Sequence, residues 1–581
     1  MTIVVESGID VVTRDGTRLA TDVYRPVDGC WPALVIRLPY GRQGKGISMN
    51  SFDVMRAVRA GYVVVAQDTR GRFDSGGEFE PFQNEADDGV DTINWVAMQP
   101  WCSGRVGMIG GSYMGVTQWT AAAAEGVPTA LQALAPVVTP ADYYDGWAYS
   151  GGAFQLGLCL WWTLHSLVPV ELRRRADRGV DGAGDQLTEV LAACNEPDPL
   201  FQHLPMRGID LFRGVAPYYE DWLDHPARDG YWQARSPLNR LRNVDVPALI
   251  IGGWFDCFLD GTFASWAALR ENQGLAQGRQ RLVIGPWAHG AMGGVFPERS
   301  FGESAGTDGA VDLPGLQLQW FDWHLGGKPP SFDLDRPVKI FVMGLDEWRD
   351  EADWPLPGTD YTDWYIDSDG AANTAAGDGT MSTRPPTGGR SDVFSYDPRC
   401  PVPTHGGRSF LPGGYIAANA GPRDQRQIES RDDVLCYTSA PLDSALTIIG
   451  PVRAIVYVSS SVPDTDITAK LVDMHADGRA MSVTDGIVRL RYRNSIEAES
   501  LLRPDAEYEV TVEMGSTAIV LAAGHRLRLE VSSSNFPRFG RNTNSGGVIA
   551  DDTAEQVRVA VNRVHHRPDA PSRLVLPVQH R

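Results

Sequence analysis

The chain has 581 residues, of which 43% are hydrophobic, and it carries 17 tryptophans and a formal net charge of −21. This length exceeds what a single hydrophobic core supports, so we expect two or three domains. The negative charge argues against nucleic acid or an anionic membrane surface as a partner. No apolar run approaches the ~18 residues of a membrane span.

Cysteine and histidine usage predicts neither a disulfide framework nor a metal site. The seven cysteines contain no Cys-x-x-Cys pair, which is typical of reduced thiols in a cytoplasmic protein. The N-terminus lacks the basic and apolar regions of a signal peptide. The 11 histidines contain no HExxH motif, and we interpret His565-His566 as a solvated pair. We therefore expect a cytoplasmic protein without a cofactor.

The first half of the chain contains short runs rich in Val, Ile and Leu, each followed by Gly, Pro or Asp. Longer segments of helical length separate them, which indicates a mostly parallel sheet covered on both faces, as in α/β proteins. Functional groups then belong at the carboxyl ends of the strands. The runs are 33–37, 62–67, 106–109, 130–138, 246–251 and 281–284.

Two other segments differ in composition from this pattern. Residues 140–237 are rich in Trp, Leu, Ala and Arg, and predict a helical cap inserted between the strands, with helices at 156–167 and 170–178. After about residue 350, alternating segments separated by Gly- and Ser-rich loops predict an all-β sandwich of jelly-roll type. The predicted strands include 453–459, 467–473, 487–492 and 526–532, and the predicted domains are a core (1–139 and 238–352), a cap (140–237) and a jelly roll (353–581).

Ser112 lies in the run Gly110-Gly111-Ser112-Tyr113-Met114-Gly115, directly after the strand predicted at 106–109. A buried strand, a sharp turn on Ser and a following helix make up a nucleophile elbow, which needs small residues around its strained backbone. The usual glycine two residues after the serine is absent here. An ordinary Gly-Gly-Ser turn is therefore the alternative.

A serine nucleophile needs a general base and a carboxylate that orients it. Asp256 follows the strand predicted at 246–251, and His289 follows the one predicted at 281–284, so the chain order is serine, acid, histidine. Taken alone, Asp256 could cap a helix and His289 could be a hydrogen-bonded loop residue. Three such residues just past three strands favour a catalytic set.

An acyl-transfer enzyme also needs hydrogen-bond donors for the oxyanion of its tetrahedral intermediate. The first expected donor is the backbone amide of Tyr113. The loop after an earlier strand begins Leu38-Pro39-Tyr40-Gly41 and has no Gly-rich run. Tyr40 could donate through its phenol, although local sequence alone favours a packing role.

These motifs resemble those of the cocaine esterase branch of the X-prolyl dipeptidyl peptidase-like serine hydrolases. The resemblance implies an α/β-hydrolase core with a helical cap and a C-terminal jelly roll. It also implies that Ser112 is the nucleophile, Asp256 the acid and His289 the base, with the Tyr40 hydroxyl and the Tyr113 amide as oxyanion donors. The matching motifs are Arg37-Leu38-Pro39-Tyr40, Gln67-Asp68-Thr69-Arg70-Gly71, the Ser112 run, Gly253-Trp254-Phe255-Asp256, Gly285-Pro286-Trp287-Ala288-His289, 341–349 and 531–537.

The resemblance implies an aromatic acyl pocket where the three domains meet, although each of its residues could equally be a core residue. Phe258 and Leu259, two and three residues after the acid, replace the carboxylates with which related α-amino-acid ester hydrolases hold an ammonium group. The segment 41–50 departs from the family and leaves the alcohol side of the pocket undetermined. The implied pocket residues are Trp147, Trp162, Phe258, Phe410 and Leu411.

The implied activity is that of a carboxylesterase for esters with apolar, aromatic (benzoyl-like) acyl groups, acting through an acyl-enzyme. Small-molecule esters are the expected partners, and a homodimer is one possible assembly. Two alternatives stay open. The same triad could serve an amide or β-lactam acylase or an X-Pro dipeptidyl peptidase-like hydrolase, or the chain could be a non-catalytic carbohydrate-binding protein.

Overall fold

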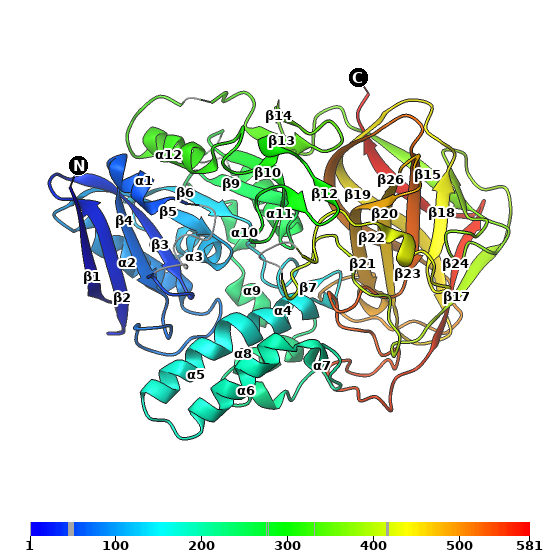
Figure 1. The fold of residues 1–581 in the computed structure, drawn as a ribbon, viewed down its shortest axis with the longest axis horizontal. Helices are drawn as coiled ribbons and strands as arrows, with labels where there is room; N and C mark the ends of the chain where they lie inside the picture. The colour runs from blue at the N-terminus through cyan, green and yellow to red at the C-terminus, as the bar shows by residue number, and fades with distance from the viewer. Residues whose placement is uncertain are drawn as a thin grey trace.

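The computed structural model describes residues 2–43, 52–272, 274, 276, 278–330, 332–413 and 418–580. Most of the segment 41–50 therefore lies outside the described residues. Three parts of the fold can be followed in Figure 1: a sheet with covering helices, a helical segment below it, and a β-sandwich at the other end of the molecule.

A ten-stranded sheet forms the first part, in the order β1-β2-β4-β3-β5-β6-β9-β10-β13-β14. The strands from β4 to β13 pair in parallel, and antiparallel pairing adds β1, β2 and β14 at the edges. The strands are β1 (Ile3–Val12), β2 (Arg18–Pro26), β3 (Trp31–Leu38), β4 (Val63–Asp68), β5 (Cys102–Gly111), β6 (Leu131–Val137), β9 (Leu249–Phe255), β10 (Arg281–Ala288), β13 (Val338–Val342) and β14 (Glu347–Glu351).

Helices cover both faces of this sheet. The helices α1 (Val54–Arg59) and α12 (Leu313–His324) share one hydrophobic cluster with the strands. The helices α2 (Glu85–Ala97), α3 (Tyr113–Ala122) and α11 (Leu259–Arg270) share a second cluster. All six apolar runs singled out in the sequence are strands of this sheet. The short strands β11 (Val295–Phe296) and β12 (Arg299–Ser300) and a 3₁₀ turn (Glu303–Ala305) lie between β10 and α12.

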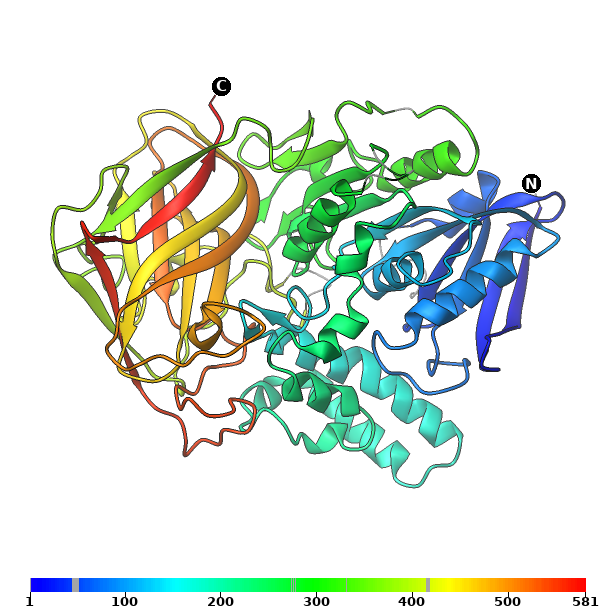
Figure 2. The ribbon, with the colours of Figure 1, turned by 180° about the vertical axis from the view of Figure 1, so that it is seen from behind.

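The helical cap, defined here as the segment from β7 to α10, is inserted between β6 and β9. It lies beside the sheet and reaches the sandwich in both views (Figure 1, Figure 2), where the amide of Gly157 donates to the carbonyl of Arg538. Its elements are β7 (Tyr149–Ser150), β8 (Ala153–Phe154), α4 (Leu156–Trp162), a π-turn (Thr163–Leu167), α5 (Val168–Asp177), α6 (Ala183–Asn195), α7 (Asp198–Phe201), a 3₁₀ turn (Asp210–Phe212), α8 (Pro217–Asp224), α9 (Gly230–Arg235) and α10 (Leu238–Leu241).

The third part is a twelve-stranded β-sandwich with its own hydrophobic cluster. One predicted strand, 487–492, is wrong in part, because β21 ends at Arg489 and Leu490–Tyr492 forms a 3₁₀ turn. A further 3₁₀ turn spans Gln425–Gln427. The strands are β15 (Asp360–Asp367), β16 (Thr380–Ser382), β17 (Ser391–Tyr396), β18 (Leu435–Ser439), β19 (Leu446–Ser460), β20 (Asp466–Met474), β21 (Ala480–Arg489), β22 (Tyr508–Leu521), β23 (Arg526–Ser532), β24 (Ala560–Arg567), β25 (Ala570–Pro571) and β26 (Arg573–Val578).

The fold is therefore an α/β-hydrolase core with an inserted helical cap and a C-terminal β-sandwich of jelly-roll type, as the sequence predicts. The seven cysteines are free thiols. Within the described ranges, every helix is too short or too polar to cross a bilayer.

The interpretation of His565-His566 as a solvated pair is wrong for His566. Both residues lie on β24, where successive side chains point to opposite faces. His566 is fully buried, and its Nε2 lies 3.0 Å from Asp392 Oδ2 and 3.1 Å from Ser368 Oγ. Strand alternation, which a dipeptide by itself does not reveal, places one imidazole inside the sandwich.

Candidate active site

Ser112 occupies a strained turn between β5 and α3. Its backbone has φ 59° and ψ −127°, a combination that ordinary residues avoid. Glycine is needed on both sides for reasons of space. A Cβ at Gly110 would lie 2.6 Å from the Cβ of Met114, and one at Gly115 would overlap the side chain of Thr139. The irregular spacing after Ser112 therefore has a cause, because position 115 is the one that faces Thr139 too closely for a side chain.

Ser112, His289 and Asp256 form one hydrogen-bonded chain at the carboxyl ends of three parallel strands. The Nε2 of His289 lies 3.0 Å from Ser112 Oγ, and its Nδ1 lies 2.9 Å from Asp256 Oδ2. Asp256 comes directly after β9 and His289 directly after β10. All three residues are buried, so few water molecules compete for these hydrogen bonds.

The carboxylate of Asp256 is held from both sides. Its Oδ1 accepts a hydrogen bond from the amide of Phe258 at 2.7 Å, while Oδ2 faces His289. The ring of Phe258 packs edge-to-face on the imidazole, with ring centres 4.9 Å apart. This set of contacts fixes the plane of the histidine ring, and with it the direction of Nε2 toward Ser112.

Tyr113 begins α3, and its buried side chain anchors the turn. The phenol oxygen accepts from the amide of Phe82 at 2.9 Å and donates to Glu85 Oε1 at 3.0 Å. Burial raises the pKa of Tyr113 well above its usual value, so the phenol stays protonated. Glu85 in turn pairs with Arg37 at 2.9 Å. The backbone amide of Tyr113 therefore sits on a fixed helix start.

Tyr40 follows β3, the strand next to β5 in the sheet. The indole Nε1 of Trp162, at the end of α4, donates a hydrogen bond to its phenol oxygen at 3.0 Å. The ring of Trp162 also lies 5.8 Å from the ring of Tyr113. Trp162 of the cap thus contacts the side chains of both Tyr40 and Tyr113.

Arg72 joins the loop that carries Tyr40 to the cap, and the sequence analysis missed it. Its guanidinium is buried and donates to the carbonyl oxygens of Pro39, Ser166 and Leu167 at 3.0, 2.9 and 3.0 Å. Burial lowers the pKa of Arg72 to about 10, which leaves it charged at neutral pH. Its acceptors on the cap lie in the π-turn after Trp162, a type of irregularity that is frequent at functional sites.

The predicted pocket residues come together in one hydrophobic cluster, and Phe258 and Phe410 of this cluster pack against His289. Phe258 stacks on Trp147 with ring centres 4.5 Å apart, and Trp147 lies 5.1 Å from Trp162. The ring of Phe410, from the sandwich, lies 5.0 Å from the imidazole of His289 on an edge-to-face approach. Leu411 packs on α4, where a side chain at Gly157 would meet its Cδ2.

Phe82 is a further member of this cluster that the sequence analysis missed. Its ring lies 5.2 Å from that of Trp147 and 5.7 Å from that of Tyr113. Its backbone has φ 71°, an unusual value for a residue other than glycine. No local pattern distinguishes it, because the loop between β4 and α2 becomes part of the site only through the tertiary fold.

Charged contacts hold the sandwich loop against the core. Arg408, two residues before Phe410, pairs with Asp260 of α11 at 2.7 Å and donates to the carbonyl of Asp485 at 2.8 Å. Asp485 also pairs with Arg538 at 2.8 Å. These contacts fix the position of Phe410 beside His289, so the site is built from the core, the cap and the sandwich together.

Two family models match the chain. The X-Pro dipeptidyl-peptidase (S15 family) model matches residues 15–291, which include the whole Ser112–Asp256–His289 set. The X-Pro dipeptidyl-peptidase C-terminal non-catalytic domain model matches residues 330–575.

A curated relative matches over nearly the full length. Cocaine esterase from Rhodococcus sp. (strain MB1 Bresler) is 42% identical over 579 residues, with 99% of this chain and 98% of the relative covered.

Solved structures share the fold at lower identity. An aminopeptidase from a marine sediment Thaumarchaeota archaeon has a TM-score of 0.81 at 23% identity, covering 100% of this chain and 96% of its own. An α-amino acid ester hydrolase has a TM-score of 0.79 at 22% identity, covering 99% and 97% of the two chains. At these identities the likeness establishes the arrangement of domains and leaves the substrate open.

Proposed function

Because this chain is a serine hydrolase that belongs to the X-Pro dipeptidyl-peptidase (S15) family, with cocaine esterase as a full-length relative, we propose that it is a carboxylesterase that uses Ser112, Asp256 and His289 as a catalytic triad. The observation that carries the proposal is the continuous chain of hydrogen bonds at 3.0 and 2.9 Å from Ser112 Oγ through His289 to Asp256. The chain order of these residues is that of α/β-hydrolases.

In the acylation step, Nε2 of His289 takes the proton of Ser112 while Oγ attacks the ester carbonyl carbon. Asp256 keeps the Nδ1 proton of His289 in place and stabilises the imidazolium that forms. The carbonyl oxygen becomes an oxyanion, which the Tyr113 amide and the Tyr40 phenol stabilise by hydrogen bonds. Collapse of the intermediate breaks the C–O bond, and His289 gives its proton to the leaving alcohol.

In the deacylation step, a water molecule takes the place of the alcohol. His289 removes a proton from the water as its oxygen attacks the acyl-enzyme carbonyl, and the same two donors hold the second oxyanion. Ser112 leaves with the proton returned by His289, and the carboxylic acid is released. One base thus serves both half-reactions, as microscopic reversibility requires.

We propose that the acyl group is apolar and aromatic, such as a benzoyl group. The stacked rings of Trp147 and Phe258 beside His289 support this assignment, because flat apolar surfaces suit an aromatic acyl group. Phe258 and Leu259 are buried and apolar, and the carboxylate of Asp260 is already paired with Arg408. An α-ammonium group would therefore find little compensation for its lost hydration here.

A panel of p-nitrophenyl esters with acyl chains from acetyl to benzoyl tests the proposal. We expect kcat/KM of the native chain to be highest for the benzoyl ester. In Trp147→Ala, kcat/KM for the benzoyl ester should fall at least about tenfold, whereas kcat/KM for the acetyl ester should change less. Trp364→Ala, in the sandwich, is the matched control for loss of a tryptophan. Equal effects of both variants on both esters would contradict the acyl assignment.

Two further measurements separate the alternatives. A fluorophosphonate probe should label the native chain and leave Ser112→Ala unlabelled; absence of labelling in both would favour the non-catalytic carbohydrate-binding alternative. Matched benzoyl esters and amides, together with an Xaa-Pro p-nitroanilide, should show faster ester hydrolysis. Faster amide turnover would instead favour an acylase or a dipeptidyl peptidase-like activity.

A further inference from the structure

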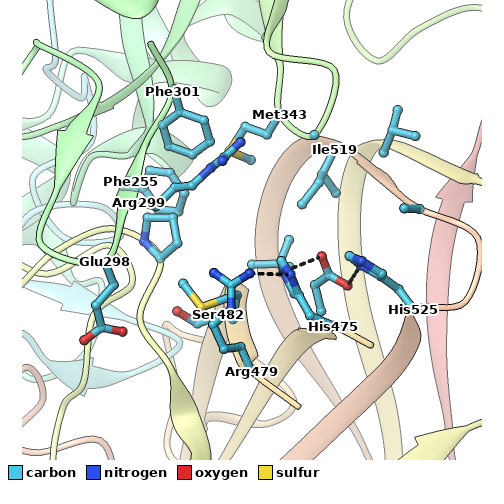
Figure 3. Close-up of a pocket in the computed structure, with 17 residues that line it drawn as sticks. Phe255, Glu298, Arg299, Phe301, Met343, His475, Arg479, Ser482, Ile519 and His525 are labelled. Carbon is cyan, nitrogen blue, oxygen red and sulfur yellow. Dashed lines mark hydrogen bonds and ion pairs between the residues drawn. The ribbon is translucent and has the colours of Figure 1, made fainter. Parts of the chain in front are cut away.

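A pocket of about 220 Å³ lies between the core and the sandwich, and Phe255, the residue before Asp256, is part of its lining. Phe301 and Met343 line it from the core, and Ile519, His475 and His525 line it from the sandwich, as Figure 3 shows. Ser112, Asp256 and His289 are not among its lining residues. The proposed esterase mechanism leaves this pocket without a role.

Three metal-ligating side chains converge at the sandwich side of this pocket. Asp473 lies on β20, His475 follows that strand, and His525 directly precedes β23. The two strands pair antiparallel, which brings the end of β20 beside the start of β23. Asp473 Oδ1 lies 2.8 Å from His525 Nδ1, and its Oδ2 lies 3.3 Å from His475 Nε2.

We propose that Asp473, His475 and His525 bind a divalent first-row transition-metal ion, with Zn²⁺ as the preferred ion. Two imidazoles and one carboxylate form a ligand set that suits zinc, nickel or cobalt and does not suit magnesium or calcium. One ligand atom from each residue can be chosen so that all three lie within 4.8 Å of one another. Ligands about 2.1 Å from a common zinc ion lie roughly 3.4 Å apart, so small side-chain rotations complete the site.

In the metal-free chain, the carboxylate of Asp473 faces a nitrogen of each imidazole. In the loaded site the same atoms would face the ion, and each neutral imidazole would carry its proton on its other ring nitrogen. The pocket adjoins the site and leaves room for a water molecule or an added anion as a further ligand.

A neighbouring positive charge, that of Arg479, predicts that one substitution will strengthen metal binding. Arg479 Nη2 lies 3.4 Å from His475 Nδ1, so its positive charge opposes a bound cation. Arg479 is also paired with Asp477 at 2.9 Å, and its side chain is 48% exposed. It can therefore move toward solvent when the ion binds, and its removal should strengthen binding.

The motif search in the sequence could not find this site. About fifty residues separate His475 from His525, and no spacing of the HExxH or Cys-x-x-Cys kind links them. Only the pairing of β20 with β23 brings them together.

Isothermal titration of the full chain with ZnCl₂, NiCl₂ and MgCl₂ after chelator treatment tests the proposal. Asp256, Cys257 and His289 also offer three ligand atoms close together, so the titrations use His289→Ala to remove that competing set. We expect one Zn²⁺ per chain, weaker Ni²⁺ binding and no Mg²⁺ binding. Absence of Zn²⁺ binding to His289→Ala would overturn the proposal.

Variants of the ligands locate the ion. Adding His475→Ala or His525→Ala to the His289→Ala chain should weaken Zn²⁺ binding by about tenfold or more. His525→Gln keeps a hydrogen-bond donor for Asp473 but offers no imidazole, so it should lose affinity equally while retaining the thermal stability of its parent. His580→Ala, an exposed histidine beside Asp360, is the matched control. Arg479→Ala should tighten binding. Unchanged affinity in His475→Ala and His525→Gln would overturn the assignment.

Discussion

The indole of Trp162 donates a hydrogen bond to the phenol oxygen of Tyr40 at 3.0 Å, and this contact connects the cap with the loop after β3. The phenol accepts this hydrogen bond through an oxygen lone pair, so the contact fixes the position of the phenol oxygen and does not itself use the phenol proton. In the proposed mechanism the phenol donates to the oxyanion. The proposed mechanism therefore gives the cap two roles, since it helps to orient an oxyanion donor and also lines the proposed acyl pocket.

Replacement of Tyr40 by Phe should lower kcat by about 100- to 1,000-fold, since one oxyanion donor is lost. KM for the same p-nitrophenyl ester should change little, because the hydrogen bond forms mainly in the transition state. Steady-state kinetics measure both quantities. Trp162→Phe keeps the phenol and most of the ring packing, so we expect a smaller fall in kcat. If kcat/KM of Tyr40→Phe instead fell by the same factor only because KM rose, with kcat unchanged, the donor role would be contradicted.

Arg72 should act on catalysis through Tyr40. Replacement by Met removes the hydrogen bond to the carbonyl of Pro39 and those to Ser166 and Leu167, so the loop after β3 loses one of its ties to the cap. We expect kcat to fall by roughly 10- to 100-fold, the size typical of a displaced catalytic group.

A double-mutant cycle separates this positioning effect from general destabilisation. In the Tyr40→Phe background, Arg72→Met should cost much less activity than in the native chain, because the group that it positions is already gone. Thermal melts of the four proteins control for unfolding at the assay temperature. Full additivity of the two losses would show that Arg72 does not act through Tyr40.

Gly115→Ala should destabilise the elbow. The added methyl group would overlap the side chain of Thr139, and strands and helix around it are closely packed. Overpacking of this kind costs about 1–3 kcal/mol, which urea unfolding can measure. Thr139→Gly removes the clashing atoms, so the double variant should recover part of the stability lost in Gly115→Ala. No recovery would mean that Thr139 is not the source of the strain.

The contact between His566 and Asp392 predicts a pH dependence of stability. Burial disfavours the charged imidazole, but the hydrogen bond and charge of Asp392 outweigh it and raise the pKa of His566. Burial likewise opposes the carboxylate of Asp392, but hydrogen bonds, first among them the one from His566, lower its pKa. The histidine therefore stabilises the fold below a pH of about 6.5 and loses this effect at higher pH, and the aspartate stabilises it above about 4.

The difference in free energy of unfolding between the native chain and His566→Gln should accordingly be largest between about pH 4 and 6.5. It should shrink toward pH 9, as His566 loses its proton in the folded state. Urea unfolding at several pH values measures it, and His580→Gln, an exposed histidine, is the control. A difference that grows toward pH 9 would show that His566 is neutral in the folded chain.

The sequence by itself determined which residues the local backbone places at strand ends. Buried parallel strands are continuous apolar runs and end at Gly, Pro or Asp, so the positions of Ser112, Asp256 and His289 after β5, β9 and β10 followed from composition and order. The family motifs then pointed to Tyr40 as a candidate oxyanion donor, whereas local sequence alone favours a packing role for it.

Only the tertiary structure decided which distant residues meet. Phe82, Arg72 and the pair His475–His525 lie in loops without a distinctive pattern, and strand pairing or cap insertion brings each to its partners. The burial of His566 likewise depends on which face of β24 the sandwich covers. Contacts between segments far apart in the chain arise from the packing of whole sheets and domains, and a local spacing rule carries no information about that packing.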